Sequence, residues 1–259
     1  MVLNKYKDYI GVFDSGVGGI SVLKELTKIL PNENFIFFGD SANAPYGEKS
    51  TEEVSTLVTR IADDLVNQGV KAIVVACNTA TSVAISQLRA TYPNIPIIGM
   101  EPAIKLAAME QPHHNILVMA TPVTLRLDKY QQLSNKLQEI SKFIPVACTG
   151  LAKRIEQGNL DDDDMYQLLN DLLSQYIGKI DCVVLGCTHY PFIKKQIRKV
   201  LGDVPFYDGN HGTVMELKRR LEINGLLTNN HNNGIIEFQS SKNNVEELQL
   251  YKWFYNQEI

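Results

Sequence analysis

A regular alternation of short apolar runs with amphipathic segments is the feature that most constrains the fold of this chain. In the first part of the chain the apolar runs begin at Ile10, Phe35, Ala72 and Ile95. Between them, segments such as residues 20–30 have the apolar spacing of a helix, and Ser50 and Glu53 form the capping-box pattern that opens a helix ending near Gly69. Near-continuous apolar strands that alternate with helices are typical of a parallel sheet covered on both faces. The sequence therefore predicts an α/β fold with a doubly wound sheet.

The same pattern begins again at Ile116. The segments "VVACNTA" and "VLGCTHY" share one layout, in which an apolar strand ends in a cysteine, a small hydroxyl residue follows, and a helix begins. This similarity predicts an internal duplication of a whole α/β unit. The boundary is expected near Gly99–Pro102, where glycine and proline interrupt the pattern.

The C-terminal part of the chain is too short for a third unit. We expect it to return to the first unit through a strand within "GIIEFQ", so that the chain crosses between the units twice. The prediction is thus two pseudo-symmetric doubly wound parallel-sheet domains, with the active site in the cleft between them. Their expected extents are residues 1–100 plus 209–259 for the first domain and residues 101–208 for the second.

Composition and charge limit the classes of function. With 259 residues, 44% apolar and 21% charged, the chain is typical of a globular protein. Its net charge of −4 gives no general electrostatic reason to bind nucleic acid or an anionic membrane, and the acidic run Asp161 to Asp164 is most simply the start of a helix. No run approaches the ~18 to 20 apolar residues of a membrane span, and the N-terminal residues lack the apolar region of a secretory signal. We expect a cytoplasmic protein whose four cysteines are free thiols.

Polar residues at the carboxyl ends of the strands are the candidate site, because ligands bind there in open α/β sheets. The sequence provides two acids, two thiols, a histidine, and several hydroxyl and amide groups. They are Asp14, Asp40, Cys77, Asn78, Thr79, Thr121, Thr124, Cys187, Thr188 and His189. The loop "DSGVGG" is not a nucleotide fingerprint, because Ser21 holds the third glycine position and no Walker lysine is present. Its glycines have the simple interpretation of a tight turn, and a helix N-terminus there still offers N–H groups to a carboxylate.

The cysteines have several interpretations. A single free cysteine is usually part of the core, and Cys148 and Cys182 are interpreted in this way. Zinc binding by Cys77, Cys187 and His189 is an alternative, although no C-x-x-C or H-x-x-x-H spacing is present. A Cys–His hydrolase is another alternative, and it gives the second thiol no role.

Two thiols at matched strand ends do have a shared role. One, as a thiolate, can remove a proton from a carbon atom, and the other, as a thiol, can return a proton to the opposite face, so that the configuration inverts. A helix N-terminus and a nearby imidazolium favour a thiolate near neutral pH, and the pair is expected to titrate as a coupled system. Asp14 or Asp40 beside an ammonium group would keep that group charged and the neighbouring C–H more acidic. These features indicate an amino acid as the substrate.

Four motifs, "FDSGVGG", "GDSANAPYGEKS", "VACNTATS" and "VLGCTHYPF", together resemble the glutamate racemase family within the aspartate/glutamate racemase superfamily. The resemblance spans both halves of the chain, with the motifs in the expected order. It implies cofactor-independent interconversion of L- and D-glutamate, without a metal, and a supply of D-glutamate for peptidoglycan. By this resemblance, Cys77 and Cys187 are the proton donor and acceptor pair, assisted by Asp14, Asp40 and His189. The substrate-binding residues that the resemblance implies are Asp14, Ser15, Tyr46, Gly47, Asn78, Thr79, Thr188 and His189, with Thr121 and Thr124 as further hydroxyl contacts.

Some points stay open at the level of sequence. Glu156 in "RIEQG" matches a family glutamate near the cleft, but the preceding "CTGLAKR" departs from the commoner proline-containing version, so its catalytic role is undecided. Aspartate is an alternative substrate, and a two-lobed amino-acid-binding module without turnover is an alternative function. We expect glutamate as the small-molecule partner, no nucleic acid, no membrane, and a homodimer. Activation by a UDP-linked muramyl precursor is not expected, because so few residues precede the strand at Ile10.

Overall fold

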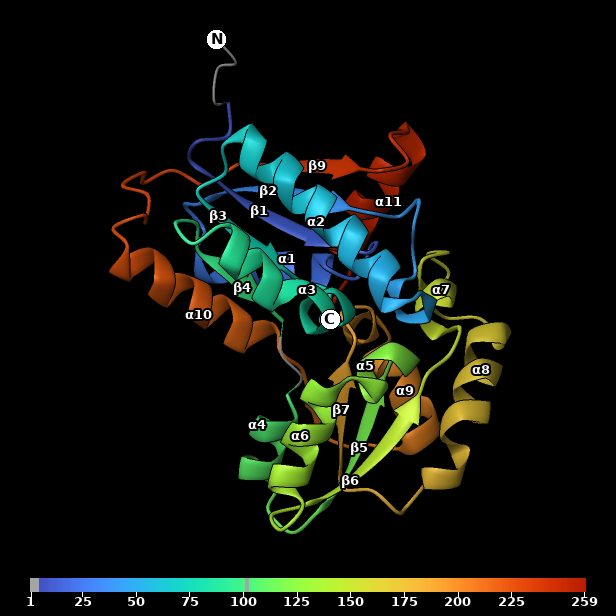
Figure 1. Ribbon diagram of the computed structural model, residues 1–259. Helices are drawn as coiled ribbons and strands as arrows, with labels where there is room; N and C mark the ends of the chain where they lie inside the picture. Colours follow the sequence, from blue (N-terminus) through green and yellow to red (C-terminus); the bar gives the residue numbers. More distant parts are fainter. Residues whose placement is uncertain (1–4, 101–102) are drawn as a thin grey trace.

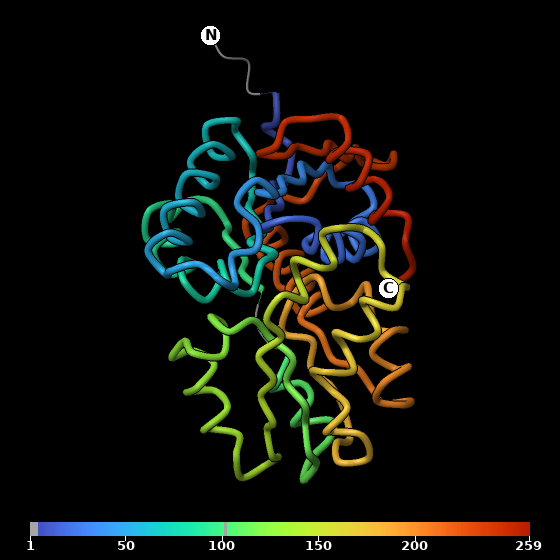
Figure 2. The backbone as a smooth tube through the Cα atoms, turned by 90° about the vertical axis from the view of Figure 1, so that its right-hand side faces the viewer, coloured from blue at the N-terminus to red at the C-terminus, as the bar shows by residue number. Residues whose placement is uncertain are grey.

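The computed structural model describes residues 5–100 and 103–259. These residues form two α/β lobes, each with its own parallel sheet (Figure 1). Elements from both ends of the chain share the upper lobe of the figure, and the middle of the chain forms the lower one. Figure 2 shows the C-terminus beside the junction of the two lobes. The predicted fold class, two parallel-sheet α/β units, is confirmed.

The first sheet contains five parallel strands in the order β4-β3-β1-β2-β9. They are β1 (Tyr9–Asp14), β2 (Asn34–Gly39), β3 (Ala72–Val75), β4 (Ile97–Gly99) and β9 (Ile236–Ser240). The helical elements of this lobe are α1 (Ile20–Ile29), η1 (Tyr46–Glu48), α2 (Thr51–Gln68), α3 (Asn78–Thr91), α10 (Asn210–Ile223) and α11 (Val245–Asn256). Side chains of a strand alternate between the two faces, so Ile10 and Val12 pack with α1, α10 and α11, while Phe13 packs with α2 and α3. The sheet is therefore covered on both faces.

The second sheet contains four parallel strands in the order β6-β5-β7-β8. They are β5 (Asn115–Ala120), β6 (Lys142–Ala147), β7 (Cys182–Gly186) and β8 (Phe206–Tyr207). The helical elements of this lobe are α4 (Ile104–Glu110), α5 (Pro122–Arg126), α6 (Asp128–Leu137), α7 (Leu151–Ile155), α8 (Asp163–Leu173), η2 (Ser174–Tyr176), η3 (Tyr190–Ile193) and α9 (Lys194–Leu201). Ile116 and Val118 pack with α4 and α6 on one face, and Leu117 and Met119 belong to the core that holds α8 and α9 on the other.

The two sheets have equivalent strand orders. The run β2-β1-β3-β4 of the first sheet corresponds, position by position, to β6-β5-β7-β8 of the second, and β9 is added at the edge beside β2. Cys77 follows β3 and Cys187 follows β7, so the two cysteines occupy equivalent places in the two lobes. The repeated layout in the sequence thus corresponds to a repeated topology.

Helix boundaries follow the sequence signals. Ser50 Oγ accepts a hydrogen bond from the Glu53 N–H, the Glu53 carboxylate accepts one from the Ser50 N–H, and α2 begins directly after Ser50. The helix ends at Gly69, which has a left-handed conformation with φ 89°. Asp162 caps α8 by accepting a hydrogen bond from the Met165 N–H, so the acidic run does start a helix, as expected.

Strand β6 and helix α10 are among the elements that the apolar pattern does not predict. Strand β6 pairs only with β5, and most of its residues are exposed or half-buried, so it has no continuous apolar run. Proline has no backbone N–H to donate to a neighbouring strand. It can stand at position 145 because β6 is an edge strand with a neighbour on one side only. Helix α10 begins within the turn-like sequence "DGNHG", which gives no helix signal.

The C-terminal segment returns to the first sheet. Strand β9 pairs in parallel with β2, with Ile236 beside Phe35. A buried ion pair supports this return: Lys71 Nζ lies 2.5 Å from Glu33 Oε2 and also donates to the Leu226 carbonyl, and Glu33 Oε1 accepts from the Thr228 N–H.

The expected division into residues 1–100 plus 209–259 and 101–208 stays a prediction, and the part of its boundary at Glu101 and Pro102 lies outside the described residues.

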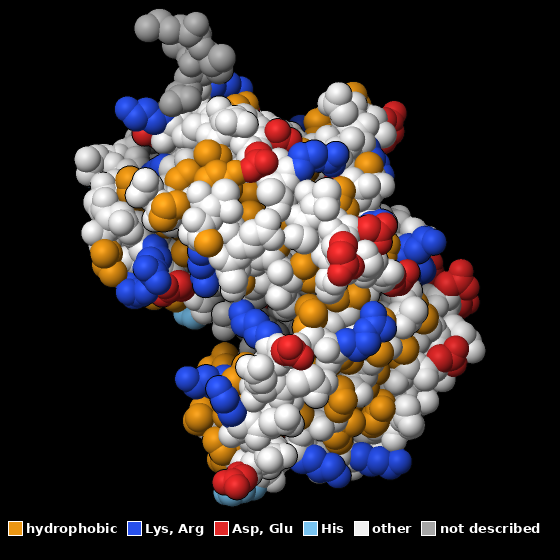
Figure 3. Space-filling model, viewed as in Figure 1, with side chains coloured by type: hydrophobic (Ala, Val, Ile, Leu, Met, Phe, Trp, Pro, Cys, Tyr) orange, Lys and Arg blue, Asp and Glu red, His pale blue; other side chains and the backbone are white. Residues whose placement is uncertain are grey.

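The surface carries charges of both signs. Figure 3 shows acidic and basic side chains mixed over the face that it displays. Within residues 5–100 and 103–259, no helix has the length and apolar character that crossing a membrane requires.

Candidate active site

Both lobes contribute to one small cavity at the carboxyl ends of their strands. Its lining residues are Ser15, Pro45, Tyr46, Gly47, Cys77, Asn78, Thr79, Thr121, Ala152, Gly186, Cys187, Thr188 and His189. Most of the residues predicted from the sequence are thus brought together, whereas Asp14, Asp40 and Thr124 do not line the cavity. The cavity volume is about 10 Å³, which is the space of one water molecule. A glutamate molecule does not fit into this space, so the cavity as described is closed.

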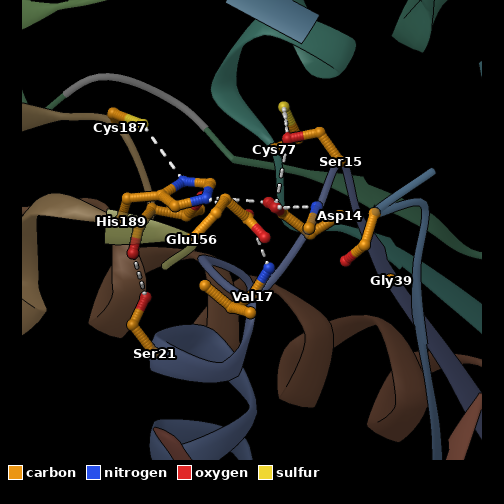
Figure 4. A network of polar contacts seen from close by, with 12 residues as sticks. Asp14, Ser15, Val17, Ser21, Gly39, Cys77, Glu156, Cys187 and His189 are labelled. Carbon is orange, nitrogen blue, oxygen red and sulfur yellow. Dashed lines mark hydrogen bonds and ion pairs between the residues drawn. The ribbon is translucent and has the colours of Figure 1, made fainter. Parts of the chain in front are cut away.

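Cys77 is placed at the cavity by the end of β3. It is the N-cap residue of α3, where its Sγ accepts a hydrogen bond from the Ala80 N–H at 3.5 Å. The thiol in turn donates to Ser15 Oγ at 3.9 Å (Figure 4). Burial raises the pKa of the Cys77 thiol, and the nearby charge of Asp14 raises it further. These surroundings favour the protonated thiol in the closed cavity.

Cys187 has a different environment. Its Sγ lies 3.5 Å from His189 Nδ1, and His189 Nε2 lies 2.6 Å from Glu156 Oε1 (Figure 4). Burial lowers the pKa of His189, but the charges and hydrogen bonds of Cys187 and Glu156 outweigh it, so the pKa lies well above its ordinary value. A charged imidazolium beside Cys187 stabilises a thiolate at that sulfur.

Glu156, whose role the sequence left undecided, is part of this arrangement. It directly follows α7, and its Oε1 accepts a hydrogen bond from the Val17 N–H at 2.9 Å as well as facing His189. The carboxylate therefore connects the glycine-rich loop of the first lobe to the histidine of the second.

Asp14 lies fully buried at the end of β1. Its Oδ1 accepts hydrogen bonds from the Gly16 N–H at 3.0 Å and the Ser15 hydroxyl at 3.3 Å, and its Oδ2 accepts one from Thr188 Oγ1 at 2.9 Å. Burial raises the pKa of Asp14, and the nearby charge of His189 and the hydrogen bonds oppose this shift. Asp14 thus holds Thr188 across the junction of the lobes.

Asp40 is also fully buried, but its partners are different. It accepts a hydrogen bond from the Tyr46 hydroxyl at 2.5 Å and two from Asn43 Nδ2 at 2.9 and 3.1 Å. Burial and the charge of Asp40 raise the pKa of Tyr46, so this phenol remains a neutral donor. Asp40 fixes Tyr46 in the cavity wall, and its predicted assistance to a thiol stays a prediction.

Three threonine hydroxyls meet across the two lobes. Thr79 at the start of α3 lies 3.1 Å from Thr121 and 3.2 Å from Thr124, oxygen to oxygen, and Thr121 donates to Thr124 at 3.0 Å. Thr121 also caps α5 by accepting from the Thr124 N–H. This group provides hydroxyl donors next to Cys77.

Two glycines of the "DSGVGG" loop are needed for close approach between the lobes. A Cβ atom at Gly16 would lie 1.8 Å from Glu156 Oε1. A Cβ atom at Gly18 would lie 2.3 Å from His189 Nδ1 and 2.5 Å from Thr188 Oγ1. These contacts, and not a tight turn alone, explain why glycine stands at both positions.

Other residues complete the surroundings. Cys182 lies at the start of β7 within the core, and burial raises its pKa to about 11. Cys148 lies after β6, donates to the Val146 carbonyl at 3.5 Å, and has a pKa raised to about 12 by burial. Sequence reasoning missed Ser21, whose hydroxyl donates to the Thr188 carbonyl at 2.9 Å, because the loop alone does not show which lobe it meets.

The chemistry of the site follows from its donor set. Among the described residues, no three His, Cys, Asp or Glu side chains are grouped to hold a metal ion. The cavity has two thiols with unequal environments: Cys77 lies beside the Ser15 hydroxyl, and Cys187 lies beside the His189 ring. Such a pair can remove a proton from a bound carbon acid and return one.

The chain is similar to known racemases. A family model described as Asp/Glu/Hydantoin racemase matches residues 10–217. A glutamate racemase from Clostridium botulinum is 47% identical over 252 residues, which are 96% of this chain and 98% of that protein.

Solved structures extend the similarity. Glutamate racemase from Francisella tularensis, in complex with D-glutamate, matches with a TM-score of 0.84 and 31% identity, over 99% of this chain and 96% of that one. The Escherichia coli glutamate racemase, whose complex contains L-glutamate, matches with a TM-score of 0.79 and 26% identity, over 95% of each chain. Taken with the family match, these similarities show that the chain belongs to the Asp/Glu/hydantoin racemase family.

Proposed function

We propose that this protein is a glutamate racemase that interconverts L- and D-glutamate by proton transfer between Cα and two thiols, without a cofactor. The observation that carries the proposal is that Cys77 and Cys187, from equivalent strands of the two lobes, line the same cavity. The relatives named above are glutamate racemases, and the two solved structures contain D- and L-glutamate respectively. These facts support glutamate as the substrate.

Racemisation consists of two proton transfers on opposite faces of Cα. One cysteine, as a thiolate, takes the Cα proton, and the electron pair of the broken C–H bond moves into the α-carboxylate. The second cysteine, as a thiol, then gives its proton to the opposite face of Cα and becomes the thiolate. The substrate has been inverted, and the negative charge has moved from one sulfur to the other. The protonation states of the pair must return before the next turnover in the same direction.

The unequal surroundings favour one starting state. The imidazolium of His189 stabilises a negative charge at Cys187, while burial and Asp14 favour the protonated Cys77. We infer that Cys77 is the protonated member of the pair in the closed cavity, because burial and Asp14 raise its pKa. Glu156 assists by keeping His189 charged, and Asp14 assists by holding Thr188.

Substrate binding is assigned to the remaining cavity residues. The two carboxylates of glutamate need hydrogen-bond donors, and the α3 N-terminus, Asn78 and the threonine hydroxyls provide them. Tyr46, fixed by Asp40, and Gly47 form the wall on the side of the first lobe. The further substrate contacts in the proposal are Ser15, Thr188 and His189.

Incubation with single enantiomers tests the proposal. Circular dichroism of L-glutamate and of D-glutamate should decay to zero with the protein alone, before and after treatment with a chelator. Aspartate, which lacks one methylene group, should react about 10- to 200-fold more slowly. Binding of glutamate without any loss of optical activity would indicate a binding module and would overturn the proposal, and faster reaction of aspartate would reassign the substrate.

The wider role rests on the family resemblance alone. We propose a supply of D-glutamate for peptidoglycan, a cytoplasmic location and a homodimer as its further parts. Light scattering at several protein concentrations tests the homodimer, since a constant monomer mass would contradict it.

A further inference from the structure

Ser21 is a buried polar residue to which the mechanism above gives no role. It is the second residue of α1 in the first lobe, and its side chain is fully buried. Its hydroxyl crosses the junction of the lobes and donates to the Thr188 carbonyl at 2.9 Å (Figure 4). Because Thr188 lies between Cys187 and His189, this hydrogen bond reaches the turn that carries one thiol and the histidine.

The local sequence explains why the Thr188 carbonyl needs a donor from outside the turn. The carbonyls of Cys187 and His189 each accept a hydrogen bond from the N–H three positions further on, at 3.1 and 3.2 Å. The matching donor for Thr188 would be the N–H of residue 191, but this residue is proline and has none. Thr188 is buried, so an unpaired carbonyl at this position would destabilise the fold.

The equivalent turn of the first lobe is held from within its own helix. There α3 begins directly after Cys77, and the Thr81 N–H, four positions further on, donates to the Cys77 carbonyl at 2.9 Å. Four positions after Cys187 stands Pro191, so this α-helical hydrogen bond cannot form, and the chain begins the short helix η3 instead. The second turn therefore depends on a donor that Ser21 provides from the opposite lobe.

The peptide unit between Thr188 and His189 connects two contacts of the site. Thr188 Oγ1 donates to Asp14 Oδ2 at 2.9 Å, and His189 Nδ1 lies 3.5 Å from Cys187 Sγ. The carbonyl of this peptide unit is the group that the Ser21 hydroxyl holds. A rotation of the unit would change the direction of both side chains, because they are attached to its two ends.

We propose that Ser21 is a positioning residue, whose hydroxyl replaces the donor that Pro191 cannot provide and thereby fixes the turn from Cys187 to His189 at the cavity. Ser21 does not line the cavity itself, so its effect on the reaction passes through this turn. The inference rests on the proposed function, because it concerns the placement of groups that the two-thiol mechanism uses.

The substitution Ser21→Ala removes the hydroxyl and leaves the Thr188 carbonyl without this donor. We expect the turn to shift and kcat/KM to fall about 10- to 100-fold, because misplacement by about 1 Å is sufficient for the larger effect. The fall must be equal for L- and D-glutamate, because enantiomers have the same free energy. The melting temperature should also fall, by about 2–4 °C, for the loss of one buried hydrogen bond.

Ser141→Ala is the matched control for the loss of stability. Ser141 is another buried serine, and its hydroxyl donates to the Gln111 carbonyl at the same distance of 2.9 Å, within the second lobe. This variant should lose a similar amount of thermal stability and keep the wild-type kcat/KM. The difference between the two variants then measures the positioning effect of Ser21.

A second substitution provides a readout that a merely structural role would not change. Pro191→Ala restores an N–H three positions after Thr188, so that the turn can provide a donor for its own carbonyl. In the Pro191→Ala background, Ser21→Ala should therefore reduce kcat/KM only about twofold, which is the usual deviation between independent changes. The two positions should thus be strongly coupled.

Three outcomes would overturn the inference. They are wild-type kinetics for Ser21→Ala, an equal loss of kcat/KM in Ser141→Ala, and an undiminished effect of Ser21→Ala in the Pro191→Ala background. Failure of the proposed function is distinguishable from these. In that case the wild-type protein would not racemise glutamate, or Cys77→Ser and Cys187→Ser would both retain its rate, whatever the behaviour of Ser21→Ala.

Discussion

Thr188 Oγ1 of the second lobe donates a hydrogen bond to Asp14 Oδ2 of the first lobe at 2.9 Å, and both groups are buried. This bond joins the two strand ends that flank the cavity. Because Thr188 follows Cys187 directly, the bond also fixes the backbone that carries the second thiol. The closed site is thus held by a direct polar contact between the lobes.

Replacement of Thr188 by valine removes this donor while retaining the shape of the side chain. Asp14 then has one fewer hydrogen bond in a buried position, so we expect kcat/KM to fall about 10- to 100-fold. Steady-state kinetics with L-glutamate measures the effect. Thr56→Val is the control, because its hydroxyl donates to the Glu52 carbonyl on an exposed part of α2, and it should keep the wild-type rate.

Glu156→Gln tests the electrostatic support of His189. The charge of Glu156 raises the pKa of His189, so its removal lowers that pKa, and the imidazolium is lost at a lower pH. The basic limb of the kcat/KM profile should therefore move to lower pH. Glu25→Gln, which breaks the exposed contact of Glu25 with His211, should leave the profile unchanged. An unshifted basic limb in Glu156→Gln would contradict the role assigned to His189.

Gly18→Ala tests the close approach of the lobes. The added methyl group would meet His189 Nδ1 at 2.3 Å and Thr188 Oγ1 at 2.5 Å, so the lobes cannot close as observed. We expect a loss of kcat/KM of about 100-fold, because misplacement of about 1 Å is sufficient for this effect. Gly212→Ala on α10 meets no atom within 4 Å and should retain full activity. Equal activities of the two variants would show that the closed arrangement is not the reactive one.

Glu33→Ala tests how the C-terminal segment is anchored. The change removes the carboxylate that neutralises the buried Lys71 and leaves only its hydrogen bond to the Leu226 carbonyl, so the free energy of unfolding should fall by about 3–5 kcal/mol. Urea unfolding followed by circular dichroism gives this value. Glu258→Ala removes the exposed pair with Lys195 and should leave the midpoint unchanged. A small effect of Glu33→Ala would mean that the strand pairing of β9 and the packing of α10 and α11 hold the segment without the ion pair.

The sequence was most informative where burial decides the pattern. The strands before Asp14, Cys77 and Cys187 are continuous apolar runs, because helices cover both faces of each sheet, and their carboxyl ends could be identified directly. Strand β6 could not be found in this way, since it lies at an edge and is partly exposed. The start of α10 could not be found from the apolar pattern either, because the helix begins in a turn-like segment.

The site was predictable as a set of residues but not as a set of contacts. The contact of Glu156 with His189 depends on where the short helix α7 ends, and apolar periodicity does not contain that information. The roles of Gly16 and Gly18 likewise appear only when the opposite lobe is in place.

Solvent isotope incorporation with single cysteine variants tests the two-thiol mechanism most directly. Wild-type protein, Cys77→Ser and Cys187→Ser would each be incubated with L-glutamate and with D-glutamate in D2O, and Cα deuterium and chirality would be followed together. The wild-type protein should place deuterium at Cα in each product enantiomer. Each variant should lose about 10²- to 10⁴-fold in racemisation from both enantiomers, because each direction needs both an acid and a base. Racemisation at the wild-type rate by either variant would contradict the mechanism.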